Sequence, residues 1–167
     1  DLAGKANTAL APLANKAIGT PGSATRKLME KTVGIAAERL LPPYARQRFS
    51  TWFTKRRGVG TNARAATTPV RAETAVLFPT CIVEYQAPEV GHDLVKVCER
   101  NGVACELPEG EVCCGAPWLH AGDVDRFVEQ GRKNVSVLAG ALRAAGPDAT
   151  VVVPQPTCSY VLKNDYV

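Results

Sequence analysis

All six cysteines of this 167-residue chain lie within residues 81–158, and their thiols are its most reactive groups. Thiolates are soft ligands, and they bind zinc or iron–sulfur clusters in preference to the hard cations that favour oxygen. The first residues do not have the layout of a signal peptide, so we expect metal binding or redox chemistry and not a framework of disulfides. The six residues are Cys81, Cys98, Cys105, Cys113, Cys114 and Cys158.

Two of the cysteines follow similar apolar segments. Residues 75–78 lead through a Pro-Thr pair to Cys81, and residues 150–153 lead through another Pro-Thr pair to Cys158. Short apolar runs closed by proline are typical of buried strands. In an open parallel sheet, ligand sites lie outside the carboxyl ends of the strands, so we expect both thiols to face one crevice. The loop that contains the adjacent residues Cys113 and Cys114 can reach the same crevice. The candidate ligands are Cys81, Cys113, Cys114 and Cys158.

The adjacent pair Cys113 and Cys114 helps to choose the metal. Neighbouring side chains in extended backbone point apart, so binding one zinc ion with both would strain the loop, whereas a cluster offers each thiolate its own iron. Zinc sites also commonly use two Cys-x-x-Cys pairs, and this sequence has none. We therefore expect an iron–sulfur site, with zinc and a strained disulfide between the two neighbours as alternatives. Gly115 gives the loop its backbone freedom.

The other cysteines and the histidines have simpler interpretations. Cys98 and Cys105 lie on expected inward faces, where cysteine packs as a small apolar residue. His120 follows the Cys-Cys-Gly loop and is interpreted as a surface histidine, with hydrogen bonding to a cluster as the alternative. No catalytic triad, pair of catalytic carboxylates or phosphate-binding glycine loop is evident, so we name no catalytic residue.

The elements that position the cysteines alternate along residues 73–167. Strands are expected at 75–78, 103–107 and 150–153, with helices between them and a last helix over 159–166. Asp123 is the expected N-cap of the long helix. This order predicts an α/β fold with a small parallel, Rossmann-like sheet covered on both faces. The expected inner stripes are Val90, Leu94, Val97 and Cys98 on the first helix, and Val124, Phe127, Val128, Val135, Leu138 and Leu142 on the second.

Residues 1–57 form a basic, helical extension in this interpretation. The net charge is +4, but the positive excess is confined to the first 70 residues. A helix over 2–17 is kinked by Pro12, and a second runs from an N-cap at Ser23 or Thr25 to Pro42. Residues 58–72 are expected to be a linker. The inner face of the second helix is expected to carry Met29, Val33, Ala36 and Leu40.

Three aromatic rings, at positions 49, 52 and 53, precede three consecutive cations at positions 55–57. One interpretation is contact with a membrane surface, where rings are buried and cations meet lipid phosphates. The favoured alternative is that the rings pack on the domain or on another subunit. No nucleic-acid motif accompanies the charge, so we expect no nucleic-acid partner. We expect a cytoplasmic protein, with peripheral contact to the inner face of the cell membrane as an alternative.

The cysteine pattern resembles a known family. Cys81, Cys113-Cys114-Gly115 and Cys158 are spaced as in the Cys-Cys-Gly cysteine-rich domain of the heterodisulfide reductase B subunit and its relatives. Residues 74–167 look most like the branch that contains the anaerobic glycerol-3-phosphate dehydrogenase C subunit. The resemblance implies an iron–sulfur cluster, of 4Fe-4S type, that passes electrons between a flavin dehydrogenase and a quinone or a thiol/disulfide acceptor. The segments that carry it are 78–81, 113–117, 122–123, 133–134 and 156–163.

The sequence also departs from this family. The fuller motif ends in Cys-x-x-Cys, and Gln155 stands at the first of these two positions. Relatives carry a ferredoxin-like domain before this region and a second Cys-Cys-Gly repeat after it, so we expect the sequence to be a fragment of a larger protein. We expect that protein to be a non-catalytic subunit of an oxidoreductase complex, with further iron–sulfur domains as partners. Two alternatives stay open. They are a cluster that reduces disulfides, with one iron left open, and a structural zinc-binding or interaction domain.

Overall fold

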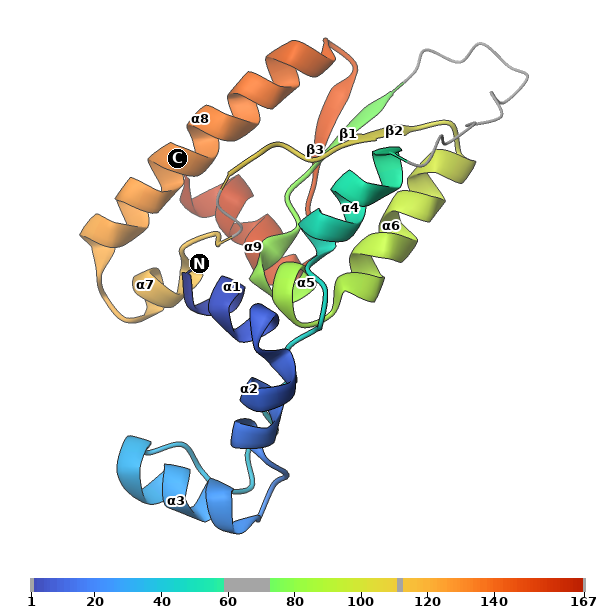
Figure 1. Cartoon of the computed structure of the whole chain (residues 1–167). Helices are drawn as coiled ribbons and strands as arrows, with labels where there is room; N and C mark the ends of the chain where they lie inside the picture. The colour runs from blue at the N-terminus through green and yellow to red at the C-terminus, as the bar shows by residue number, and fades with distance from the viewer. Residues whose placement is uncertain (1, 59–72, 111–112, 167) are drawn as a thin grey trace.

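A computed structural model describes residues 2–58, 73–110 and 113–166 (Figure 1). The front of the chain is helical, and the rest alternates strands with helices. The elements are α1 Leu2–Ala9, α2 Ala11–Ile18, α3 Ala24–Val33, α4 Phe49–Gly58, β1 Thr74–Leu77, α5 Thr80–Tyr85, α6 Pro88–Arg100, β2 Ala104–Glu106, α7 Ala116–His120, α8 Val124–Ala145, β3 Ala149–Val152, α9 Pro156–Tyr160 and the π-helical turn η1 Val161–Asp165.

The three strands form one parallel sheet in the order β2-β1-β3. The central strand β1 is almost completely buried, and its Ala75 pairs with Cys105 on one side and Thr150 on the other. Parallel strands need crossover connections, which α5 with α6 supply on one side and α7 with α8 on the other. The predicted α/β fold with a parallel sheet is confirmed.

Helices cover both faces of this sheet (Figure 1). Side chains alternate along β1 and the residue after it. Ala75 and Leu77 enter a core with α4 and α6, whereas Val76 and Phe78 enter a core with α8 and the segments that carry Cys114 and Cys158. The candidate ligands Cys114 and Cys158 are therefore part of the core on the α8 face.

Helix α8 begins after its expected N-cap, but α6 and α8 present faces to the sheet that differ in part from those predicted. Asp123 caps α8, because its Oδ1 accepts a hydrogen bond from the Arg126 backbone N–H at 3.2 Å. Val90 and Val97 of α6, and Val124, Val128 and Val135 of α8, are exposed, so this part of the predicted stripes is wrong. The buried positions are Gly91 and Val95 of α6, and Phe127, Gln130, Gly131, Asn134 and Leu138 of α8.

Close packing and hydrogen bonding explain these rotations. A Cβ atom at Gly91 would lie 2.5 Å from the Phe49 ring, so this glycine lets α4 approach α6 closely. On α8, the buried amides Gln130 and Asn134 find hydrogen-bond partners inside the domain. Buried polar groups with such partners are tolerated, and hydrophobic periodicity alone does not find them.

The front helices are shorter than predicted. The kink expected at Pro12 is present, because the helix breaks at Leu10 and Pro12 lies in the first turn of α2. Ser23 caps α3 as expected, but α3 ends at Gly34, which has a φ of 73°, and does not reach Pro42. The predicted inner face of this helix is therefore also wrong, because Val33 and Leu40 are exposed.

The aromatic segment packs on the domain. Phe49 and Phe53 are buried in the core beside α6, and the Arg56 guanidinium lies 4.6 Å from the centre of the Phe53 ring. The favoured interpretation of these rings is confirmed. No helix in the described ranges is long and apolar enough to cross a membrane. Apart from Gly58, the predicted linker 58–72 lies outside the described residues.

Candidate metal centre

The four predicted ligands come from three segments at the carboxyl end of the sheet. Cys81 lies in the first turn of α5, directly after β1, and Cys158 lies in α9, after β3. Cys113 and Cys114 precede the short helix α7. The four thiols lie near enough for the charges of the other three to influence the pKa of Cys158. The structure thus brings together sulfur atoms that are up to 77 residues apart in the sequence.

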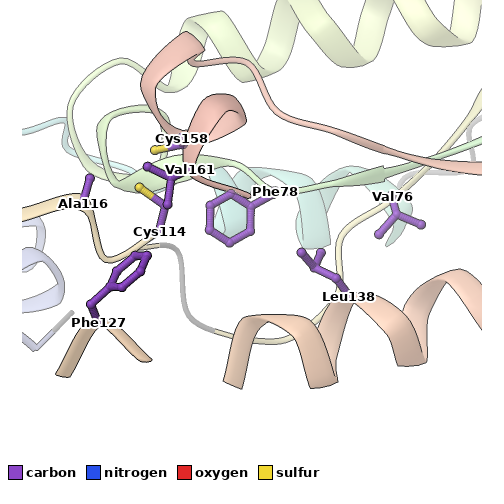
Figure 2. Close-up of a cluster of buried hydrophobic side chains, with 8 residues drawn as sticks. All are labelled: Val76, Phe78, Cys114, Ala116, Phe127, Leu138, Cys158 and Val161. Atoms are coloured by element: carbon purple, nitrogen blue, oxygen red, sulfur yellow. The ribbon is translucent and has the colours of Figure 1, made fainter. Parts of the chain in front are cut away.

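Cys114 and Cys158 form the buried part of this group. Their exposed fractions are 3% and 4%, and Figure 2 shows the two side chains next to each other in the core. The Cys158 thiol donates a hydrogen bond to the sulfur of Cys114, which together with backbone amides and the charge of His120 lowers the pKa of Cys114 to about 6, against the opposing effect of burial. The same hydrogen bond, and then burial, raise the pKa of Cys158. The pair therefore favours ionisation of Cys114 beside a protonated Cys158.

Cys81 and Cys113 form the accessible part. Cys81 is exposed and Cys113 is half-buried. Burial of part of the side chain raises the pKa of Cys81, and the charges of Cys113 and Cys114 raise it further. Within the described part of the chain, no three histidine, cysteine or acidic side chains already form a set of ligands around one point. Ligation by all four thiols would require their side chains to draw closer together.

The glycine after the cysteine pair has the conformation that the sequence predicted. Gly115 has a φ of 86°, which other residues rarely adopt, and a Cβ atom there would lie 2.9 Å from Cδ2 of Phe127. Its backbone N–H donates a hydrogen bond to Cys113 Sγ at 3.4 Å. Gly115 therefore lets the loop turn against α8 and directs an amide at a candidate ligand.

A network of polar side chains fixes the backbone of the cysteine pair. Asn134 Nδ2 donates to the carbonyl oxygen of Cys113 at 2.9 Å and to the hydroxyl of Tyr166 at 2.8 Å. The Tyr166 hydroxyl donates in turn to the carbonyl oxygen of Cys114 at 2.7 Å. Gln130 supports Asn134 from the previous turn of α8. Both peptide groups of the pair are thus held from outside the loop.

Sequence reasoning did not find this network. Gln130 and Asn134 are spaced four residues apart on α8, a spacing that places two side chains on one helix face. Their position among the apolar residues of the buried stripe was the available signal. Burial and the nearby thiolates raise the pKa of Tyr166 to about 12, so its hydroxyl keeps its proton and stays a donor at neutral pH.

Gln155 occupies the place where the related motif has a further cysteine. Its Oε1 lies 3.5 Å from Cys158 Sγ, within hydrogen-bond range of the thiol. A neutral amide oxygen is a harder and weaker ligand for iron than a thiolate. This side of the site therefore carries a polar contact in place of a fifth sulfur.

Backbone strain is found beside Cys81. Thr80 has a φ of 71°, and in the described residues it is the only one other than glycine with a positive φ. It is fully buried, and its hydroxyl accepts a long hydrogen bond from the Val83 N–H at 3.5 Å. Such strain persists where the surrounding packing imposes it, and it is frequent at functional sites.

The remaining cysteines lie on the opposite face of the sheet. Cys105 is buried in the core with α4 and α6, and Cys98 packs against the same core. Burial, the charge of Cys98 and a hydrogen bond with it raise the pKa of Cys105 to about 12. The prediction that these two residues pack in the core is confirmed.

The donor set fits a soft metal site. Four thiols approach from three directions, one of them is readily ionised, and backbone amides point at the sulfurs of Cys113 and Cys114. Amide hydrogen bonds to sulfur are among the features that tune iron–sulfur centres, and burial of two ligands limits the access of water. These residues would hold a thiolate-ligated cluster.

Comparison with known proteins agrees with the geometry. Residues 75–163 match the CCG cysteine-rich domain family. The C subunit of the anaerobic glycerol-3-phosphate dehydrogenase of Escherichia coli strain K12 is 31% identical over 166 residues, which are 99% of this chain and 39% of that protein. The chain thus spans about two fifths of this relative's length.

Two archaeal relatives match a shorter part of the chain. The B subunit of the CoM/CoB fumarate reductase of Methanothermobacter marburgensis is 32% identical over 89 residues, 53% of this chain and 17% of that protein. A protein of Methanocaldococcus jannaschii that is named an iron-sulfur protein is 33% identical over 89 residues, with the same coverage. No solved structure is significantly similar to the chain. Because the family match covers more than half of the chain and includes all four candidate ligands, the chain belongs to the CCG cysteine-rich domain family.

Proposed function

We propose that Cys81, Cys113, Cys114 and Cys158 bind an iron–sulfur cluster, of 4Fe-4S type, through which the chain transfers electrons within an oxidoreductase complex. The observation that carries the proposal is the convergence of four thiols from three separate segments at the carboxyl end of the sheet. The names of the relatives support it, since one is an iron-sulfur protein and others are dehydrogenase and reductase subunits.

The proposed partners are a flavin dehydrogenase subunit and further iron–sulfur domains, with a quinone or a thiol/disulfide pair as the final acceptor. The name of the Escherichia coli relative, the C subunit of a dehydrogenase, supports a role beside other subunits. The chain itself would hold the cluster, limit water access through the buried pair Cys114 and Cys158, and fix the ligand loop through Asn134 and Tyr166. We propose a cytoplasmic location for this complex.

A second candidate function is reduction of a disulfide at the cluster. The observation that favours it is Gln155, whose amide stands beside Cys158 at the place of a fifth thiolate. An iron that lacks this ligand would have a position for a substrate sulfur. Catalytic turnover of a small disulfide by the isolated, reconstituted chain, supplied with an artificial two-electron reductant, would support this function, and its absence would favour electron transfer alone.

The test is anaerobic reconstitution of the chain followed by measurement of iron, acid-labile sulfide and zinc. We expect iron with sulfide, and we expect Cys113→Ser and Cys158→Ser each to lower the iron content several-fold. Cys98→Ser is the matched control, because Cys98 lies on the opposite face of the sheet, and we expect it to keep nearly all of the iron. Equal losses from all three variants, or zinc without sulfide, would contradict the proposal.

A further inference from the structure

An open, positively charged pocket lies between α1 and the start of α4. Its volume is about 350 Å³, which is within the range of small-molecule sites. Residues from α1 form one wall, and the residues that lead into α4, with its first two turns, form the other. The pocket shares no lining residue with the cysteine site. The lining residues that matter for its chemistry are Lys5, Thr8, Arg46, Arg48, Thr51 and Lys55.

The charged side chains that line the pocket are positive. Four cationic side chains line it, and no carboxylate among the described residues does. Outside the lining, the Glu84 carboxylate lies 3.7 Å from the Arg48 guanidinium and already accepts two hydrogen bonds from Ser50. It offsets the charge of Arg48, whereas neither Arg46 nor Lys55 has a carboxylate partner among the described residues. Like charges grouped around a concave surface create a positive potential that concentrates anions.

An unsatisfied hydroxyl marks the same pocket independently of its charge. Thr8 lines the pocket and is only 5% exposed, and its Oγ1 has no hydrogen-bond partner among the described residues. A buried hydroxyl without a partner is destabilising, so valine would suit this position better for stability alone. A ligand with acceptor oxygens would supply the missing partner.

We propose that this pocket binds a phosphate group, either free or esterified. The cations and the Thr8 hydroxyl supply donors from both walls, which suits an anion with several acceptor oxygens. Arginine and lysine are the residues that most often hold phosphate, arginine through paired hydrogen bonds and lysine as a point charge. The volume leaves room for an organic group beyond the phosphate. This site goes beyond the proposed electron transfer and does not depend on it.

The first experiment is calorimetric titration of the full chain with inorganic phosphate at constant, low ionic strength. We expect saturable binding to one site and a loss in affinity of about tenfold for Arg46→Gln, the size expected for one charge-assisted contact. The double variant Arg46→Gln/Lys55→Gln should bind about a hundredfold more weakly. The matched control is Lys27→Gln/Lys31→Gln, which removes the same charge from exposed positions on α3 and should change affinity less than twofold.

Thr8→Val separates a built site from general attraction to positive charge. It removes the hydroxyl and keeps the shape, so we expect phosphate affinity to fall several-fold while the melting temperature without phosphate stays equal or rises. Absence of phosphate binding to the wild type would overturn the proposal. Equal losses in the α3 control, or unchanged affinity in Thr8→Val, would also overturn it.

A vesicle arm distinguishes the two sources of phosphate. Co-sedimentation with phosphatidylglycerol vesicles, compared with phosphatidylcholine vesicles, is measured for the wild type and for Arg46→Gln/Lys55→Gln. Vesicle binding that inorganic phosphate displaces and the double variant lacks assigns the site to a lipid headgroup. Calorimetric binding of phosphate with no such vesicle binding assigns it to a soluble phosphate compound. Both results support the pocket as a phosphate site.

Discussion

Tyr166 is expected to hold the cysteine pair in place through its hydroxyl group. Replacement of Tyr166 by phenylalanine keeps the ring, whose centre lies 5.8 Å from that of Phe127, and removes only the hydroxyl. Two hydrogen bonds are lost, one donated to the Cys114 carbonyl at 2.7 Å and one accepted from Asn134 at 2.8 Å. At about 1 kcal/mol for each neutral bond, the loss is about 2 kcal/mol.

The measurement has one stability readout and one metal readout. For a chain of this length, about 2 kcal/mol corresponds to a fall in melting temperature of roughly 4 to 8 °C, which circular dichroism of the reduced, metal-free protein detects. We also expect Tyr166→Phe to lower the iron retained after anaerobic reconstitution, because the carbonyl of one candidate ligand is no longer fixed. Loss of stability without any change in iron content would refute the positioning role.

The matched control is Tyr160→Phe. This tyrosine lies in the neighbouring helix α9 and is 62% exposed, so removal of its hydroxyl should change neither readout. A double-mutant cycle of Tyr166→Phe with Asn134→Leu should show a coupling energy of about 1 kcal/mol, because the two side chains share a hydrogen bond. Equal effects of the two tyrosine variants would contradict the reasoning.

Two further substitutions test the supports of the site. Gly115→Ala should destabilise the chain by roughly 1 to 2 kcal/mol because of its positive φ, with an added cost from the contact with Phe127. Gly122 has a similar φ and no atom within 4 Å of an added Cβ, so Gly122→Ala is the control. The difference between the urea midpoints of the two variants measures the clash with Phe127. Equal midpoints would contradict the clash. Glu84→Gln should lower the free energy of unfolding by roughly 2 to 3 kcal/mol, because the 2% exposed carboxylate accepts a hydrogen bond from the Ser50 N–H at 2.9 Å. Thermal unfolding measures this loss, with the exposed substitution Glu89→Gln as the control. Similar melting temperatures of the two variants would show that the contact contributes little.

Part of the site followed directly from sequence. Cys81 and Cys158 each come after a short apolar strand, and the rule for parallel sheets predicted that they lie at the same edge. Gly115 was expected to adopt an unusual backbone angle, and it does. The caps at Ser23 and Asp123 were found in the same way, because capping depends on residues three positions apart.

The faces of the helices were predicted less well. A 3.6-residue period is compatible with more than one apolar stripe along a helix. Valines such as Val128 and Val135 led to the prediction of a buried stripe that includes them, and both are exposed in the structure. The face that packs is decided by what lies opposite, and on α8 this is a cysteine loop whose carbonyl groups need the amide of Asn134. The residues near Asn134 in the sequence do not indicate that these carbonyl groups need a hydrogen-bond donor.

The sequence by itself determined the three strands, their order along the chain, their parallel pairing and the candidate thiols, since these depend on local periodicity, on turn residues and on cysteine spacing. Tertiary structure alone decided that Tyr166 reaches the Cys114 carbonyl, 52 residues away, and that Thr8 of α1 faces the cations before α4. The physical reason is that these contacts depend on how whole elements pack against one another. Hydrogen bonds and charges of this kind act over a few ångströms in space, whatever the separation along the chain.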